Sequence, residues 1–115
     1  LTPFELTPGF ERVTRVSIKP ENVVAFLQST EVLEAAMKAA GEDFQLAVFA
    51  PIGGGPEGNT LMVRGFAKDG KSMGAMFDKG YAGASWSQAF AAMQSLVDSF
   101  ERDSIEECEI LYTAE

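Results

Sequence analysis

The stretch from Ser85 to Arg102, SWSQAFAAMQSLVDSFER, limits most strongly what this chain can fold into. Its apolar residues recur at spacings of three and four, which is the pattern of one face of an amphipathic helix. They are Trp86, Ala89, Phe90, Met93, Leu96, Val97 and Phe100. Ser85 is a good N-cap, and Gln88 completes a capping-box pattern with it. A helix of this length that is apolar on one side needs a broad partner, and the rest of the chain predicts a sheet.

Alternating apolar and polar residues predict the strands of that sheet, and one earlier segment has helical spacing. The predicted strands are Arg12–Ile18, Phe44–Ile52, Thr60–Ala67 and Ile105–Thr113, and the earlier helix is Val23–Ala40. The connection from Lys68 to Ala84 is rich in glycine and has room for one short helix, Ser72–Phe77. The order βαββαβ predicts an α+β, ferredoxin-like sandwich. Its four-stranded antiparallel sheet carries both helices on one face, with the strands in the order 4-1-3-2.

The length of 115 residues fits one domain. We expect an extended N-terminal arm over residues 1–10, which contains Pro3 and Pro8, and a single domain over residues 11–115. The net charge of −8 argues against nucleic acid and anionic membrane as partners. No apolar run is long enough to span a bilayer. We therefore expect a soluble protein, and the sequence leaves open whether it is cytoplasmic or exported after an upstream signal peptide.

Cysteine and histidine usage narrows the chemistry further. Cys108 is the only cysteine and histidine is absent, so the sequence offers no intrachain disulfide, thiolate metal cluster or Ser-His or Cys-His pair. We expect no metal and no cofactor, and the residues identify no catalytic base. Whether the protein is an enzyme stays open.

Two motifs match nucleotide or RNA signatures in letters only. Residues 65–72, GFAKDGKS, satisfy the phosphate-loop pattern, but Gly74 and Gly80 are expected to interrupt the helix that this loop requires. Arg64–Ala67 echoes an RNA-recognition signature, but Lys68 and Asp69 replace the aromatic residues that should follow. We interpret both as coincidences.

The predicted fold leaves one face of the sheet without helices, and that face is apolar. Its apolar residues are Val13, Ala47, Phe49, Met62, Phe66 and Leu111. A monomer would expose a large patch there, so we expect a partner on this face. The simplest partner is a second copy, which gives a homodimer closed sheet against sheet.

Charged residues in the middle of that face need an explanation, because burying a charge is costly unless it is paired. Arg15 on the first strand and Arg64 on the third should be neighbours, with Glu109 of the last strand beside Arg15. They would either bind a ligand oxygen or form an ion-pair network between subunits. The candidates for apolar contacts with a ligand are Phe49, Phe66 and Trp86. Trp86 would otherwise pack in the core of the domain.

Residues 86–95, WSQAFAAMQS, together with the closing strand Glu109–Tyr112, carry a resemblance to a known family. The chain resembles the dimeric α/β-barrel superfamily, and within it the antibiotic-biosynthesis-monooxygenase-like proteins. Many members have histidine where this chain has Met93, and the haem-degrading branch uses a helix histidine to bind iron. The resemblance therefore does not extend to haem degradation. The Lys68–Ala84 connection is also longer than is usual in the family.

The resemblance implies a homodimer whose helix-free sheet faces enclose an apolar pocket. From it we expect a protein that binds a small apolar or aromatic molecule between the sheet faces. If the protein is an enzyme, the resemblance implies a cofactor-independent oxygenation or rearrangement of an aromatic or enolisable compound. The alternative is a non-catalytic dimeric module whose sheet faces are filled by their own side chains.

Overall fold

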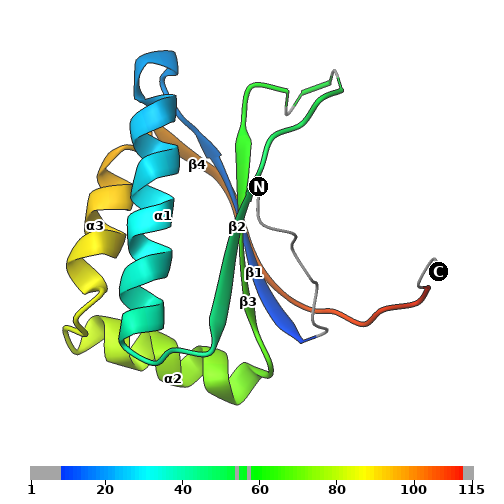
Figure 1. The fold of residues 1–115 in the computed structure, drawn as a ribbon. Coiled ribbons are helices and arrows are strands. Elements are labelled where there is room, and N and C mark those ends of the chain that lie inside the picture. The colour runs from blue at the N-terminus through cyan, green and yellow to red at the C-terminus, as the bar shows by residue number, and fades with distance from the viewer. Residues whose placement is uncertain (1–8, 54, 57, 113–115) are drawn as a thin grey trace.

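A four-stranded antiparallel sheet with helices on one face makes up the fold (Figure 1). The computed structural model describes residues 9–53, 55–56 and 58–112. Strands β1 (Phe10–Ser17), β2 (Phe44–Phe49), β3 (Leu61–Ala67) and β4 (Ser99–Glu107) lie in the order β2-β3-β1-β4. This is the predicted order, and the ferredoxin-like α+β fold is confirmed.

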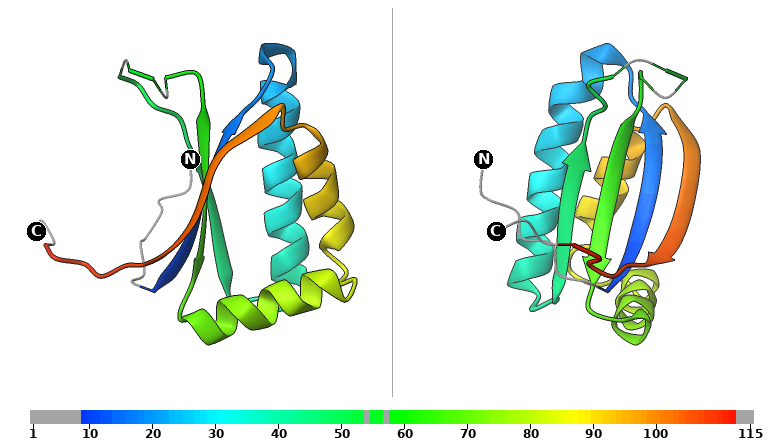
Figure 2. Two further views of the ribbon diagram at one scale, coloured as in Figure 1. Left: turned by 180° about the vertical axis from the view of Figure 1, so that it is seen from behind. Right: turned by 90° about the vertical axis from the view of Figure 1, so that its right-hand side faces the viewer.

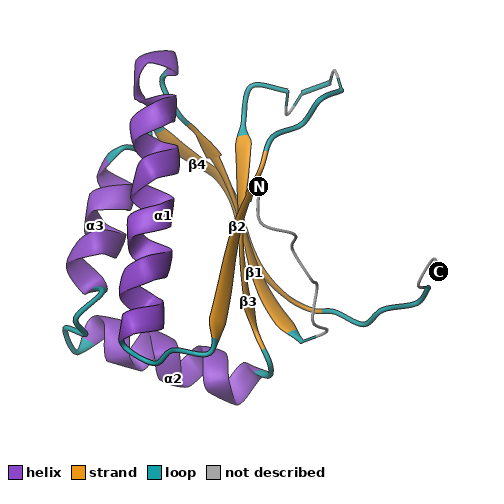
Figure 3. Cartoon of the chain, viewed as in Figure 1, coloured by secondary structure: helices purple, strands orange, loops and turns teal. Residues whose placement is uncertain are grey.

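The helices lie together on one side of the sheet, as the views from behind and from the right also show (Figure 2). They are α1 (Val23–Ala39), which follows the short 3-10 turn η1 (Pro20–Asn22), α2 (Gly70–Tyr81) and α3 (Ser87–Ser95). Helices α1 and α3 run along the sheet, and α2 crosses its lower end (Figure 3). In the described part of the chain, no helix has the length and the apolar character that crossing a bilayer requires.

The boundary between the last helix and the last strand differs from the prediction. Helix α3 ends at Ser95, and β4 begins at Ser99, so the predicted helix to Arg102 is wrong. Phe100 fits the helical spacing of three and four in the sequence, but it lies in β4. There it pairs with Val16 and is on the face of the sheet that the helices cover. The sequence pattern does not reveal this strand, because it is an edge strand of mainly charged and polar residues. Edge strands often carry such residues. The predicted N-cap is also wrong, because α3 starts at Ser87 with Trp86 at the N-cap position.

The predicted short helix after β3 is a full helix, α2, of 12 residues. Its N-cap is Asp69, whose carboxylate accepts a hydrogen bond from the backbone N–H of Ser72 at 2.7 Å. Gly74 and Gly80 therefore do not interrupt the helix, contrary to expectation. The Asp69 carboxylate occupies the helix N-terminus where the phosphate-loop pattern would need to hold an anion.

The core lies between the helices and the sheet. Its buried residues come from all three helices, from β1 and β3 and from the turn before α3. They are Val16, Phe26, Leu33, Met37, Val63, Met76, Trp86 and Met93. For Trp86 the sequence left either a ligand contact or a core role open, and the residue is part of this core.

Two predictions concern the chain ends, and part of each falls on residues that the structure does not describe. Of the predicted arm over residues 1–10, only Gly9 and Phe10 are described, and Phe10 already belongs to β1. The predicted bounds Ile105–Thr113 of the last strand are wrong: β4 runs from Ser99 to Glu107, residues 108–112 follow it, and Thr113 is not described.

Candidate functional site

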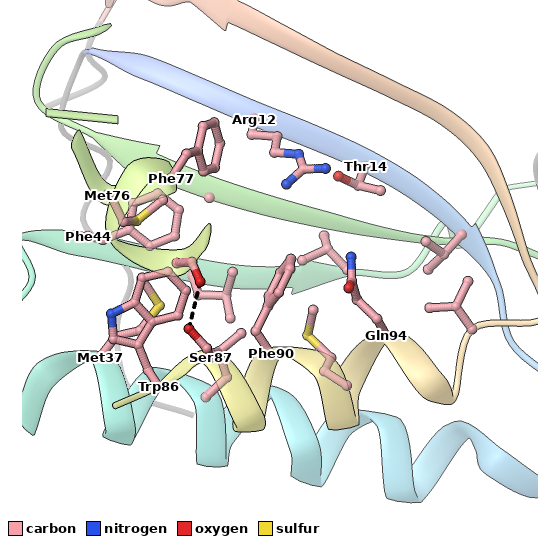
Figure 4. A pocket seen from close by; sticks show the side chains of 18 of the residues that line it. Arg12, Thr14, Met37, Phe44, Met76, Phe77, Trp86, Ser87, Phe90 and Gln94 are labelled. Carbon is pink, nitrogen blue, oxygen red and sulfur yellow. Dashed lines mark hydrogen bonds between the residues drawn. The ribbon is translucent and has the colours of Figure 1, made fainter. Parts of the chain in front are cut away.

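A cavity of about 300 Å³ lies between the three helices and the face of the sheet that they cover (Figure 4). Its wall is mostly aromatic, aliphatic and methionine side chains, with a few polar groups. The residues that line it include Arg12, Thr14, Phe26, Met37, Phe44, Gly65, Met76, Phe77, Tyr81, Trp86, Ser87, Phe90, Met93, Gln94 and Phe100. A concave, mainly apolar space with few polar groups is the usual form of a small-molecule site.

The period of two in the strands decides which side chains reach the cavity. Arg12, Thr14 and Val16 alternate along β1 and all line it. Phe44 does so from β2, where it pairs with Ala67 and lies against Gly65 of β3. A side chain at Gly65 would overlap the Phe44 ring, so the glycine makes room for that ring. From α3, Phe90 and Gln94 reach toward the sheet (Figure 4).

Trp86 lines one end of the cavity and carries a buried polar group. The residue is 4% exposed, and its Nε1–H has no hydrogen-bond partner among the described residues. Its ring lies against Gly80, where an added Cβ would stand 2.7 Å from Cη2 of the indole. Beside it, the Ser87 hydroxyl donates to the carbonyl oxygen of Gly80 at 2.9 Å. A buried donor without an acceptor costs about 1–3 kcal/mol, which an acceptor on a bound molecule would recover.

Arg12 supplies a charged group at the β1 side of the cavity, and its partner is Asp103 of β4. Arg12 donates to Asp103 twice, from Nε at 3.0 Å and from Nη2 at 2.8 Å, and the Thr14 hydroxyl donates to the same carboxylate at 2.9 Å. The hydrogen bonds from Arg12 are the main reason that the pKa of Asp103 lies below its usual value. The same contact raises the pKa of Arg12, whose guanidinium lies 5.4 Å from the centre of the Phe77 ring. Both groups therefore stay charged near neutral pH.

The predicted arginines lie on the other face of the sheet. Arg15 pairs with Met62 and Arg64 pairs with Val13, so both arginines are on the helix-free face of adjacent central strands, as predicted. The position expected for Glu109 is wrong, because Arg102 stands opposite Arg15 and Glu109 follows the end of β4. Arg15 instead donates to the Thr60 hydroxyl at 3.1 Å and to Sδ of Met62 at 3.6 Å.

Arg64 belongs to a buried cluster that the sequence did not predict. Its Nε donates to the carboxylate of Glu11, which is only 1% exposed. The guanidinium lies 5.4 Å from the centre of the Phe49 ring and 5.5 Å from that of Phe66, and the bond to Glu11 raises the pKa of Arg64. Cys108 donates its thiol to the same carboxylate at 3.4 Å, and burial is the main reason that the pKa of this thiol is raised.

Of the six predicted ligand-binding residues, only Trp86 lines the cavity. The others are Arg15, Arg64, Phe49 and Phe66 on the helix-free face and Glu109 beyond β4. The cavity residues Arg12 and Gln94 were missed, although Arg12 shares the alternating face of Thr14 and Val16. Among the described residues, no group of three or more acidic, histidine or cysteine side chains is placed to hold a metal ion.

Comparison with known proteins gives matches in structure alone. No family model and no curated protein matches the sequence. A provisionally named antibiotic biosynthesis monooxygenase from Bordetella bronchiseptica is 7% identical, covers 88% of this chain and 97% of its own, and superimposes with a TM-score of 0.65. A second protein with that provisional name, from Deinococcus radiodurans, is 14% identical, with coverages of 92% and 98% and a TM-score of 0.61.

An uncharacterised NIPSNAP domain protein from Burkholderia xenovorans is 11% identical, with coverages of 91% and 99% and a TM-score of 0.63. At these identities the likeness concerns the fold. The resemblance drawn from residues 86–95 is confirmed at that level: this chain has the ferredoxin-like α+β fold of the solved antibiotic-biosynthesis-monooxygenase-like proteins.

Proposed function

We propose that the protein binds a small, largely apolar molecule in the cavity between its helices and its sheet. The observation that carries this proposal is the cavity itself, about 300 Å³ in volume and lined mainly by apolar side chains. At about 30 Å³ per water molecule, a space of 300 Å³ equals about ten waters, which suits a ligand with one or two rings. The proposed site is on the opposite face of the sheet from the one expected from the sequence.

The unpartnered indole N–H of Trp86 supports the same proposal, because a bound acceptor would satisfy it. The names of the structurally similar proteins from Bordetella and Deinococcus add an activity to test, oxygenation of the bound molecule. That activity comes to this chain through the fold alone, so ligand binding is the step to establish first.

Trp86 is the only tryptophan, so its indole N–H gives a single, site-specific NMR signal. We expect that titration with butylbenzene, a purely apolar probe of suitable size, shifts this signal in a saturable way. The matched control is Ile52, which is fully exposed and away from the cavity, and its methyl signals should not move. If the indole signal does not move up to the solubility limit of butylbenzene or of its ring-substituted homologues, the proposal is wrong.

We also propose that two copies associate through the helix-free face. Phe49 is 36% exposed on this face, and the described parts of the β2–β3 loop and of the C-terminal segment run on the side of the sheet away from the helices (Figure 1). Their exposed apolar residues are Ile52, Ile110, Leu111 and Tyr112. Apolar groups gathered on one side in this way are usual at protein interfaces. The alternative, a non-catalytic dimeric module whose sheet faces are filled by their own side chains, shares this interface.

Replacing Phe49 by Asp should weaken the dimer at least ten-fold, because it places a carboxylate in the apolar contact. The matched control is Val24→Asp, since Val24 is 67% exposed on α1 and away from this face. Sedimentation equilibrium and native mass spectrometry measure the dimer fraction. A wild-type monomer at micromolar concentration, or equal effects of the two substitutions, would contradict the proposal.

A further inference from the structure

We infer that Arg12 selects the polar end of the bound molecule and favours an uncharged oxygen acceptor over a carboxylate. The inference rests on the proposed function, because it concerns a ligand in the same cavity. It assigns to Arg12 the role of a specificity-determining residue.

Arg12 is held in place before any ligand arrives. Its Nε and Nη2 both donate hydrogen bonds to the Asp103 carboxylate, which also accepts one from the Thr14 hydroxyl. The Phe77 ring packs at 5.4 Å from the guanidinium carbon. A guanidinium fixed on two sides loses little freedom when it makes a further hydrogen bond.

The remaining terminal nitrogen, Nη1, is the group available to a ligand. The hydrogen bonds of Arg12 to described residues leave from Nε and Nη2, not from Nη1, and the Arg12 side chain lines the cavity and is only 30% exposed. Figure 4 shows Arg12 and Thr14 on the β1 side of the cavity, with the apolar rings of Phe44, Phe77 and Phe90 below and beside them. A molecule with one acceptor oxygen and an apolar body fits this arrangement, with the oxygen at Arg12.

The charge around Arg12 decides between a neutral and an anionic acceptor. Asp103 neutralises the guanidinium, so the pair attracts an anion only weakly, and a ligand carboxylate at Nη1 would lie close to the Asp103 carboxylate. The chain as a whole carries a net charge of −8, which also opposes an anion. An uncharged carbonyl keeps the hydrogen bond without the repulsion.

Three probes that share a phenylalkyl body separate these possibilities: butylbenzene, the ketone benzylacetone and the carboxylate hydrocinnamate. We expect wild-type protein, followed through the Trp86 indole signal at neutral pH, to bind benzylacetone about ten-fold more tightly than hydrocinnamate. Arg12→Met should weaken benzylacetone about ten-fold and leave butylbenzene within two-fold, because only the hydrogen bond is lost. The control Lys38→Met, which removes an exposed lysine paired with Glu34 outside the cavity, should change none of the three affinities.

Asp103→Asn is the second variant, and it should strengthen the binding of a probe, whereas Arg12→Met weakens it. Asp103→Asn leaves Arg12 with an uncompensated charge, so hydrocinnamate should bind at least ten-fold more tightly than to wild-type protein. If all three probes bind wild-type protein alike and neither variant changes their order, the inference is wrong while the proposed function stands. If butylbenzene and benzylacetone both fail to bind wild-type protein, the proposed function itself fails.

Discussion

Arg64→Met is expected to lower the free energy of unfolding by about 3–5 kcal/mol. Its partner Glu11 is only 1% exposed, so the variant leaves a carboxylate buried without its cation. The Cys108 thiol is the only other described group that donates a side-chain hydrogen bond to this carboxylate, and a thiol is a weak donor. The cost is therefore that of an uncompensated buried charge, and urea unfolding at neutral pH measures it.

The double variant Arg64→Met/Glu11→Met separates this cause from lost packing. It removes both charges and keeps apolar groups of similar length, so we expect it to recover most of the lost stability. The control Lys38→Met breaks an exposed i,i+4 pair with Glu34 and should cost no more than about 0.5 kcal/mol. If the double variant is as unstable as Arg64→Met alone, the buried charge is not the cause.

Gly65→Ala is expected to cost about 1–3 kcal/mol of stability and to weaken butylbenzene binding at least ten-fold. The new methyl group would overlap the Phe44 ring, which lies directly against Gly65. Both residues line the cavity, so the ring has to move within it or carry β2 away from α1. Either movement changes the volume available to a ligand.

Gly74→Ala is the matched control for this prediction. A Cβ at Gly74 meets nothing within 4 Å, and the residue lies inside α2. Alanine there should stabilise the protein by about 0.5–1 kcal/mol and leave butylbenzene affinity unchanged. Thermal unfolding and the Trp86 indole titration give both quantities for each variant. A Gly65→Ala protein that binds butylbenzene as wild type does would contradict the expected role of Gly65.

The fold was largely predictable because most of its local signals are strong. Alternation in β1, β2 and β3 and helical spacing in α1 fix the element order, and the order alone implies the strand arrangement. The signal failed at residues 96–107, where Phe100 fits a helix period although it lies in a strand. Over so short a span, one apolar residue fits the spacing of a helix as well as that of a strand. The charged edge strand β4 has no apolar face that would distinguish the two.

The candidate site was less predictable, because a cavity depends on how distant side chains fail to fill a space. The face assignment of Arg15 and Arg64 followed from alternation and is correct. No local pattern shows that Phe44, Phe90 and Trp86 leave room between them, since the same residues would read as a filled core. The pair Arg12–Asp103 joins positions 91 residues apart, in strands whose register the sequence did not define.

The position of β1 in the sheet has a consequence for how the chain is made. This first strand lies between β3 and β4, and β4 is the last element of the described residues. In a growing polypeptide, β1 can pair with β3 at one edge once β3 has been made, but its other edge stays open until β4 has been made. Contacts between segments so far apart in sequence form slowly, so a chaperone or another strand has time to occupy that edge.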